Sequence, residues 1–310
     1  MQNNKQKFHN FLGPKYWIIW ISLAVLRLSC FLKYPTQIKF GQSIGRIFYY
    51  TASGRRAIVQ RNLGLAFPDL SEEERDKICV DHFAALGVSL IEMALSRWAS
   101  NKKLRGLTRI EGKQHLEEAL SKGIGIIFLS AHFTTLEIGG RLLSLYTPPF
   151  DIVYRPNRNN FITEILNTTR AKFAHSNIEK NNIKTMVKNL RQGIPVWYAP
   201  DQSYNRKQSA IISFFGVPAM TNIATSALAK LGNSIVVPYF PRRLKEGGYL
   251  LTIKPPIENF PSNNPIEDTK KYISILENHI RQCPEQYFWI HRKYKNLPDP
   301  FPNFYEDLES

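Results

Sequence analysis

The pattern that most constrains the fold of this 310-residue chain is an alternation of two periodicities beyond Gly106. Short runs rich in β-branched and aromatic residues alternate there with longer stretches whose apolar residues recur at helical spacing. The predicted strands are 123–130, 151–155, 195–199, 234–240 and 249–254, and the predicted helices are 136–146, 160–173, 182–191, 222–231 and 268–281. Such alternation is typical of an α/β fold. We therefore predict a mixed, largely parallel sheet flanked by helices.

A further helix is predicted to begin at Ser71, where a serine suited to an N-cap is followed by three glutamates that the helix dipole favours. Apolar residues then recur at helical spacing from Phe83 to Ala94, which predicts a buried face. A hydrophobic fraction of 43% over this length favours a packed domain over disorder. We assign 36–310 to a single α/β domain.

The N-terminus differs in kind, because the stretch from Trp17 to Leu32 is almost continuously apolar and is preceded by lysines. We predict that 1–35 is a hydrophobic membrane anchor. Sixteen residues at about 1.5 Å each fall short of a hydrocarbon core of roughly 30 Å, and Arg27 interrupts the run. A membrane span and a tilted, half-inserted helix both stay open, and a buried core helix is the alternative to an anchor.

The formal net charge of +16 favours anionic partners: phospholipid headgroups, phosphorylated sugars, an acidic carrier protein or nucleic acid. Because no nucleic-acid-binding motif accompanies the charge, we expect a membrane or lipid phosphate and no nucleic acid. The cysteines at 30, 79 and 283 have wide spacing that fits neither a disulfide framework nor a zinc site. A reducing cytoplasm is the simplest setting, and no metal site is predicted.

The strongest catalytic signal lies where the first apolar strand ends. The run 124–129 leads directly to His132, and the carboxyl ends of strands are where α/β sheets hold their sites. Glu137 follows five residues later, about 140° around a continuous helix, so His132 must precede the helix that contains Glu137. The carboxylate would then hold one imidazole nitrogen and leave the other to accept a proton from a substrate hydroxyl. A simpler alternative is that the helix dipole alone favours these two residues.

Three charged residues follow other predicted strands. Arg155 and Arg158 come after one strand, where guanidinium groups can bind phosphate bidentately, and Asp201 follows another strand through a turn fixed by Pro200. Asp201 could anchor a basic residue or orient an acceptor. Solvated surface arginines and an ordinary loop carboxylate are the alternatives.

The sequence Ala-His132-Phe-Thr-Thr-Leu-Glu137 resembles the His-x4-Asp/Glu motif of glycerolipid-type acyltransferases, in the form found in the lauroyl and myristoyl acyltransferases of lipid A biosynthesis. Four further segments are similar to that family in the same order, at 154–159, 196–202, 214–219 and 284–292. Arg170-Ala-Lys172 resembles a basic pair that relatives write as Arg-x-Arg. The resemblance extends from the N-terminal apolar segment to about Tyr294.

The resemblance implies an enzyme that moves a fatty-acyl chain from an acyl-carrier-protein thioester to a 3-hydroxyacyl hydroxyl of a lipid A precursor. It implies action at the cytoplasmic face of the bacterial inner membrane, with His132 as general base and Glu137 as its partner. The expected substrate-binding residues are Arg155, Arg158, Arg170 and Asp201. No cofactor, metal or covalent acyl-enzyme is expected.

Two other functions stay open. The same motif could serve another membrane lipid acceptor, such as a phosphatidylinositol mannoside or a lysophospholipid. The chain could also be a non-catalytic, basic membrane-binding protein. Within the expected family, the sequence Gln-Ser-Tyr-Asn after Asp201 departs from relatives that carry a second acidic residue and a glycine there, so the choice of acyl chain is not predicted.

Overall fold

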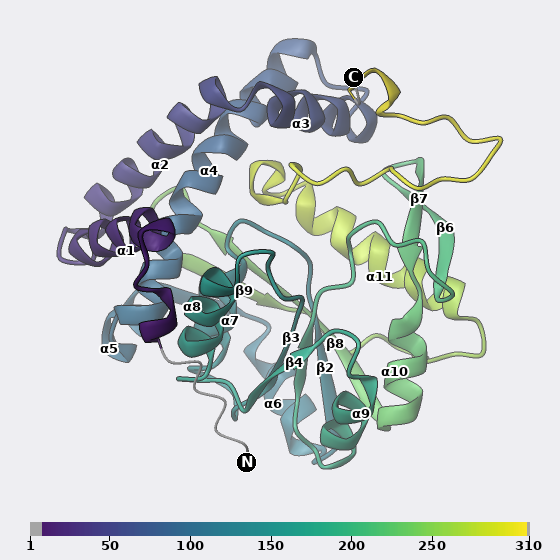
Figure 1. The fold of residues 1–310 in the computed structure, drawn as a ribbon. Helices are drawn as coiled ribbons and strands as arrows, with labels where there is room; N and C mark the ends of the chain where they lie inside the picture. Colours follow the sequence, from purple (N-terminus) through teal and green to yellow (C-terminus); the bar gives the residue numbers. More distant parts are fainter. Residues whose placement is uncertain (1–7, 309–310) are drawn as a thin grey trace.

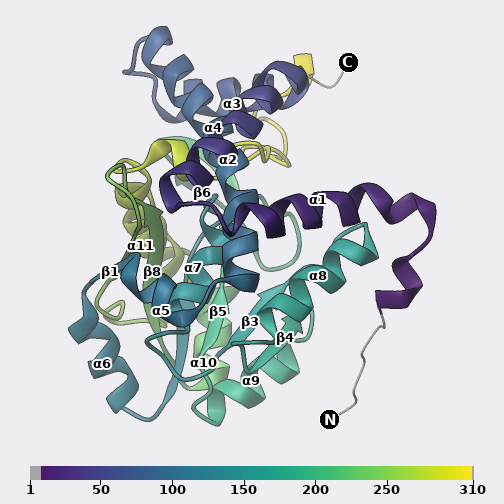
Figure 2. The ribbon, with the colours of Figure 1, turned by 90° about the vertical axis from the view of Figure 1, so that its left-hand side faces the viewer.

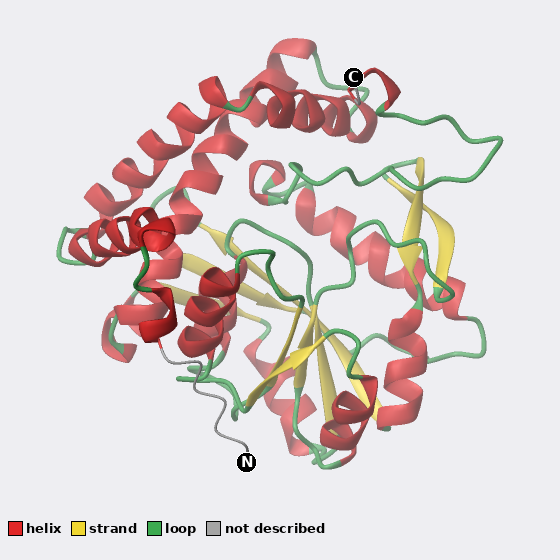
Figure 3. Cartoon of the chain, viewed as in Figure 1, coloured by secondary structure: helices red, strands yellow, loops and turns green. Residues whose placement is uncertain are grey.

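A computed structural model describes residues 8–308, and a seven-stranded sheet forms its centre (Figures 1 and 3). The strands are β1 (Thr108–Glu111), β2 (Gly125–Leu129), β3 (Asp151–Tyr154), β4 (Ser176–Glu179), β5 (Val196–Tyr198), β8 (Ser234–Arg243) and β9 (Tyr249–Ile253), in the spatial order β1-β9-β8-β2-β5-β3-β4. All neighbours pair in parallel except β8 with β9. The predicted mixed, largely parallel sheet is confirmed.

Helices cover both faces of this sheet (Figure 3). They are α5 (Asn101–Gly106), α6 (Lys113–Ser121), α7 (Leu136–Leu143), α8 (Asn160–Arg170), α9 (Ile183–Arg191), α10 (Ala224–Gly232) and α11 (Pro265–Ile280), whereas α3 (Ser53–Ala66) packs on other helices. Side chains from α9, α10 and α11 share one hydrophobic cluster with β2 residues such as Ile127, whereas α6 and α7 share another with Ile126 and Phe128. Successive strand residues point to opposite faces of the sheet, and both faces of β2 are covered. All residues of β2 are therefore buried, and its sequence is apolar throughout.

Each predicted strand and helix beyond Gly106 has its counterpart in the structure, but the sheet also contains two strands that the pattern did not predict. These are β1 and β4, which lie at the two ends of the strand order. Edge strands are short and half exposed, and the sequences Thr-Arg-Ile-Glu and Ser-Asn-Ile-Glu therefore lack an apolar run. A separate hairpin of β6 (Ser209–Phe214) and β7 (Val217–Asn222) turns at Phe215 and Gly216, both at positive φ.

Helix α4 (Glu72–Trp98) begins as predicted, with a capping box between Ser71 and Glu74. Among the described residues it is the helix long and apolar enough to cross a membrane. It nevertheless packs against α7 and, more extensively, against α2 (Tyr34–Thr51), which lies alongside it (Figure 2). A Cβ atom at Gly87 would lie 2.1 Å from the carbonyl oxygen of Gly41, so the glycines permit this approach. We therefore interpret α4 as a core helix.

The predicted N-terminal helix is α1 (Trp17–Ser29), which extends as an arm above α8 (Figure 2). One side of α1 packs through Trp20 onto Phe161 of α8, with ring centroids 4.9 Å apart. Its other side stays exposed although it is apolar; this outer face consists of Ile18, Ile21, Val25 and Leu28. At 13 residues, α1 is shorter than the apolar run in the sequence.

Candidate active site

The candidate site forms where β2 and β5 end side by side. These strands pair in parallel with Leu129 opposite Tyr198, and each is followed three residues later by a functional side chain, His132 or Asp201. The Nδ1 atom of His132 lies 2.6 Å from Oδ1 of Asp201, and the backbone N–H of His132 donates to the same oxygen at 3.1 Å. The sheet register thus brings together two residues that are 69 positions apart.

Glu137 lies in the first turn of α7, as predicted, but its carboxylate is bound to Arg170. The Nε atom of Arg170 donates to Oε2 of Glu137 at 3.1 Å, and a second bond joins Nη2 to Oε1. No hydrogen bond joins His132 to Glu137, both of which the structure describes. The expected contact between them is thus replaced by His132–Asp201 and Glu137–Arg170. Arg170 is only 7% exposed, and a buried positive charge is stabilised by a carboxylate partner.

The same hydrogen bonds involve two residues that were expected to bind substrate. Arg170 was expected to bind substrate, but both of its hydrogen bonds go to Glu137. Asp201 was expected to anchor a basic residue or orient the acceptor, and its carboxylate holds the basic residue His132. The hydroxyl of Tyr287 donates to the other oxygen of this carboxylate, Oδ2, at 3.0 Å. Arg170 still lines the cleft beside His132, so its contact with substrate stays a prediction.

Asp201 is ionised in this environment. Burial alone would raise its pKa, but the charge of His132, the hydrogen bonds from that residue and the charge of Lys293 outweigh burial and hold the pKa of Asp201 at about 2. A buried carboxylate bound to an imidazole Nδ1 fixes the ring orientation and favours a proton on that nitrogen. The opposite nitrogen, Nε2, has no partner among the described residues and belongs to a side chain that lines the cleft.

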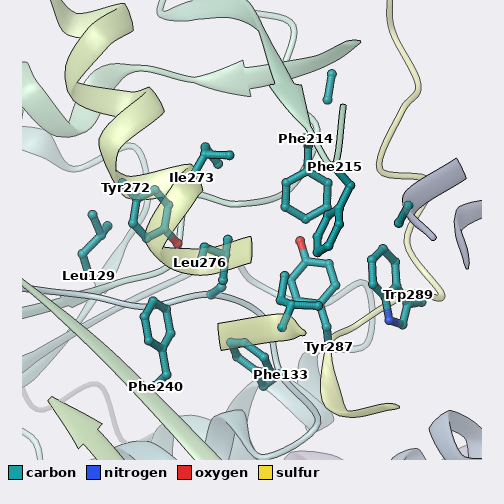
Figure 4. Close-up of a cluster of buried hydrophobic side chains, with 14 of the residues drawn as sticks. Leu129, Phe133, Phe214, Phe215, Phe240, Tyr272, Ile273, Leu276, Tyr287 and Trp289 are labelled. Carbon is teal, nitrogen blue, oxygen red and sulfur yellow. The ribbon is translucent and has the colours of Figure 1, made fainter. Parts of the chain in front are cut away.

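Two residues that support Asp201 were not identified from the sequence. The Lys293 ammonium is buried and donates to the backbone carbonyl of Asp201 at 2.5 Å; burial lowers the pKa of Lys293 to about 8, although Asp201 and Glu277 act in the opposite direction. The ring of Tyr287 packs among Phe133, Phe214 and Trp289 (Figure 4). The segment 284–292 had been singled out as a family motif, but nothing in its local pattern indicated which residue it contacts.

His132 opens onto a cleft of about 460 Å³. Its lining includes Leu136, Glu137, Val153, Tyr154, Arg155, Leu166, Arg170, Lys180, Ile183, Trp197, Tyr198, His291 and Lys295. Arg155 thus lies where predicted, whereas the exposed Arg158 is not part of the lining. Burial lowers the pKa of Lys180, and the nearby charges of Arg155 and Arg206 lower it further. Arg155 and Lys180, which line the cleft, form a basic rim suited to an anion, and the charge of Arg206 lies nearby.

A small apolar pocket adjoins the cleft at Glu137 and Leu166, which line both. It has a volume of about 30 Å³ and lies between α1, α4 and α8, with Leu23, Met93 and Ile165 among its walls. The cleft therefore combines a His–Asp pair, a basic rim and an apolar extension. Within residues 8–308, no group of three or more His, Cys, Asp or Glu side chains is arranged to hold a metal ion.

A His–Asp pair at the carboxyl end of a parallel strand, above a cleft with a basic rim, defines this chain as an α/β protein with an enzyme-like site. Residues 4–296 match the family model of the bacterial lipid A biosynthesis acyltransferases. The chain is 34% identical to the lipid A biosynthesis lauroyltransferase of Escherichia coli strain K12 over 306 residues, which cover 97% of this chain and 99% of that protein. It is 35% identical to the palmitoleoyltransferase of the same organism over 93% and 94% of the two chains.

A more distant relative, the lipid A biosynthesis myristoyltransferase of Escherichia coli strain K12, is 26% identical over 91% of this chain and 88% of its own length. The chain belongs to the bacterial lipid A biosynthesis acyltransferases. The family predicted from the motifs is therefore confirmed, and with it the class of enzyme.

Proposed function

We propose that this enzyme transfers a fatty-acyl chain from an acyl-carrier-protein thioester to a 3-hydroxyacyl hydroxyl of a lipid A precursor. The observation that supports this most is the His132–Asp201 pair beside a cleft that offers both a basic rim and an apolar extension. A phosphorylated acceptor requires the basic rim, and the apolar pocket of about 30 Å³ marks the side of the cleft that suits its acyl chains. The relatives are named for lauroyl, palmitoleoyl and myristoyl transfer, so the chain length of the donor is not assigned.

In the proposed mechanism, Nε2 of His132 takes the proton of the acceptor hydroxyl as its oxygen attacks the thioester carbonyl. The new C–O bond forms, the C–S bond breaks, and the imidazolium returns the proton to the leaving thiolate. Asp201 stabilises the imidazolium through Nδ1. We assign to Arg170, held by Glu137, the stabilisation of negative charge on the carbonyl oxygen.

The direct test incubates the purified full-length protein with acyl carrier protein thioester and a panel of acceptors. The expected product is the acylated lipid A precursor, detected by mass spectrometry. Transfer to a lysophospholipid in preference to the lipid A precursor would contradict the acceptor. No transfer to any acceptor would favour a non-catalytic, membrane-binding role.

Replacement of Arg155 by glutamine tests the basic rim. We expect the KM for the acceptor to rise about tenfold to a hundredfold, as loss of a charge-assisted contact of about 1.5–3 kcal/mol predicts. Arg158→Gln is the matched control, because Arg158 is exposed on the same loop but does not line the cleft. Steady-state kinetics with phosphorylated and dephosphorylated acceptor should show that removal of the phosphates abolishes the difference between Arg155→Gln and wild type. Equal use of both acceptors by the wild type would contradict phosphate binding.

The outer face of α1 supports membrane attachment. This helix is apolar on its exposed side as well as on its packed side. Exposed apolar surface is unfavourable in water, and burying it in a membrane removes that cost. Its 13 residues at about 1.5 Å each are too short for a hydrocarbon core of roughly 30 Å. We therefore assign α1 to the membrane interface, half-inserted rather than spanning, and place the catalytic domain at the cytoplasmic face of the bacterial inner membrane.

Polar substitution of the outer face tests this assignment. The triple variant Ile21→Ser, Val25→Ser, Leu28→Ser should bind phospholipid vesicles at least tenfold more weakly, since each side chain loses about 1 kcal/mol or more of apolar burial. All three side chains are exposed, so the melting temperature should stay near that of the wild type. Vesicle sedimentation in high salt measures the effect, and undiminished binding there would locate the attachment elsewhere. Deletion of 1–33 is a less clean test, because it also removes the contact of Trp20 with Phe161.

A further inference from the structure

Four cationic side chains from four different parts of the chain come together near the C-terminal end of α1. Arg27 belongs to α1, Arg97 to α4, Arg141 to α7, and Lys172 follows α8. The guanidinium groups of Arg27 and Arg97 lie 5.5 and 5.6 Å from the centroid of one ring, that of Trp98. The guanidinium of Arg141 lies 5.5 Å from the ring centroid of Phe173, the residue next to Lys172. Burial lowers the pKa of Lys172, and the charges of Arg97, Arg141 and Arg27 lower it further. No ion pair with a carboxylate involves any of these four side chains, all of which lie in the described part of the chain. We call this group the basic cluster.

Neutral contacts fix the basic cluster without neutralising it. Arg97 donates to the hydroxyl of Thr169 at 2.7 Å, and the ammonium of Lys172 donates to the backbone carbonyl of Arg97 at 2.9 Å. The guanidinium of Arg27 lies 5.5 Å from the ring centroid of Trp98. Four positive charges held together by neutral partners repel one another, so an anion bound among them would stabilise the arrangement.

The position of the basic cluster indicates which anion fits. Arg27 lies on the same helix as the outer face, one residue before the exposed Leu28, and the Phe31 ring lies 5.2 Å from its guanidinium. Basic and aromatic side chains beside an inserted apolar helix are typical of the depth at which lipid phosphates lie. We propose that the basic cluster binds the phosphate of an anionic membrane phospholipid while α1 lies in the membrane interface.

This site is separate from the one proposed for the acceptor. None of the four side chains lines the cleft that contains His132, although Arg97 borders the apolar pocket beside it. A carrier protein would have to dock at the cleft, because its thioester must reach His132, and the basic cluster does not line that cleft. The outer face beside the basic cluster is apolar, which suits lipid better than a soluble acidic protein. The inference rests on the proposed docking of α1 and does not depend on the proposed reaction.

The test measures flotation of the full chain with two kinds of vesicle: phosphatidylcholine alone, and phosphatidylcholine with about one fifth phosphatidylglycerol. The variant Arg27→Gln, Lys172→Gln removes two charges from the basic cluster. The control Lys184→Gln, Lys188→Gln removes two exposed charges from α9. At about 1 kcal/mol for each basic residue near an anionic surface, the cluster variant should bind anionic vesicles about thirtyfold more weakly. The control should change by less than about threefold, and binding to neutral vesicles should be the same for all three proteins.

A charge-preserving variant, Arg27→Lys, Lys172→Arg, should restore most of the binding to anionic vesicles, which separates charge from the packing of Arg27 on Trp98. Equal losses in the cluster variant and the control would overturn the site in favour of general attraction. An unchanged affinity for anionic vesicles with a raised KM for acyl carrier protein thioester in detergent would reassign the cluster to the carrier protein. Failure of the wild type to bind neutral vesicles would contradict the docking of α1, and the difference between the two vesicle types would still report on the cluster.

Discussion

Replacement of His132 by alanine is expected to lower the turnover number by about three to four orders of magnitude. Without the imidazole of His132, the cleft loses the base proposed to take the proton of the acceptor hydroxyl. The side chain of His132 is 30% exposed, so its removal leaves little unfilled space and the variant should fold. Binding to membranes should also persist, because α1 is untouched.

Single-turnover acyl transfer with saturating acceptor measures this loss. His115→Ala on α6 is a suitable control, because it removes an imidazole that does not line the cleft, and its rate should stay near that of the wild type. Near wild-type turnover by His132→Ala would rule out the proposed base.

Replacement of Asp201 by asparagine is expected to have the second-largest effect, a loss of about three orders of magnitude or more. The amide can donate a hydrogen bond to Nδ1 of His132, which moves the ring proton to Nε2. Because Nε2 is the nitrogen that accepts the proton of the acceptor hydroxyl, the protonated Nε2 can no longer act as the base. Glu137→Gln should also be severe, but through Arg170, since Asp201 would continue to hold the ring.

Proton NMR distinguishes these two carboxylates. A low-field signal from the Nδ1 proton of His132 should appear in the wild type and in Glu137→Gln, and it should be absent from Asp201→Asn. Loss of the signal in Glu137→Gln with retention in Asp201→Asn would show that Glu137 is the partner in solution. Acid unfolding offers a second readout, because a pKa lowered from 3.8 to about 2 contributes stability that is present above about pH 4 and is lost as the pH falls toward 2. Asp201→Asn should remove that part of the acid dependence.

The class of fold and the location of the site could be predicted because both have local signatures. The alternation of strand-like and helical periodicities predicted the sheet and its flanking helices, since each element records its own buried face in its own residues. The position of His132 directly after the first buried strand predicted that it would lie at the carboxyl edge of the sheet. Segments resembling one family, spread in order along the chain, identified that family.

The partners of those residues were decided only by the tertiary structure. Asp201 reaches His132 across 69 positions because β5 lies next to β2 in the sheet. The order of strands in a sheet cannot be predicted from the residues of either strand. Glu137, five positions from His132, was the nearest carboxylate in the sequence, but the end of α8 brings Arg170 to it from 33 positions away. The sequence by itself therefore determined which residues are candidates for the site, such as His132 and Asp201, and that they lie at the carboxyl edge of the sheet. Their pairing followed from packing, because contacts between distant segments depend on the arrangement of the whole fold and not on the spacing of residues along the chain.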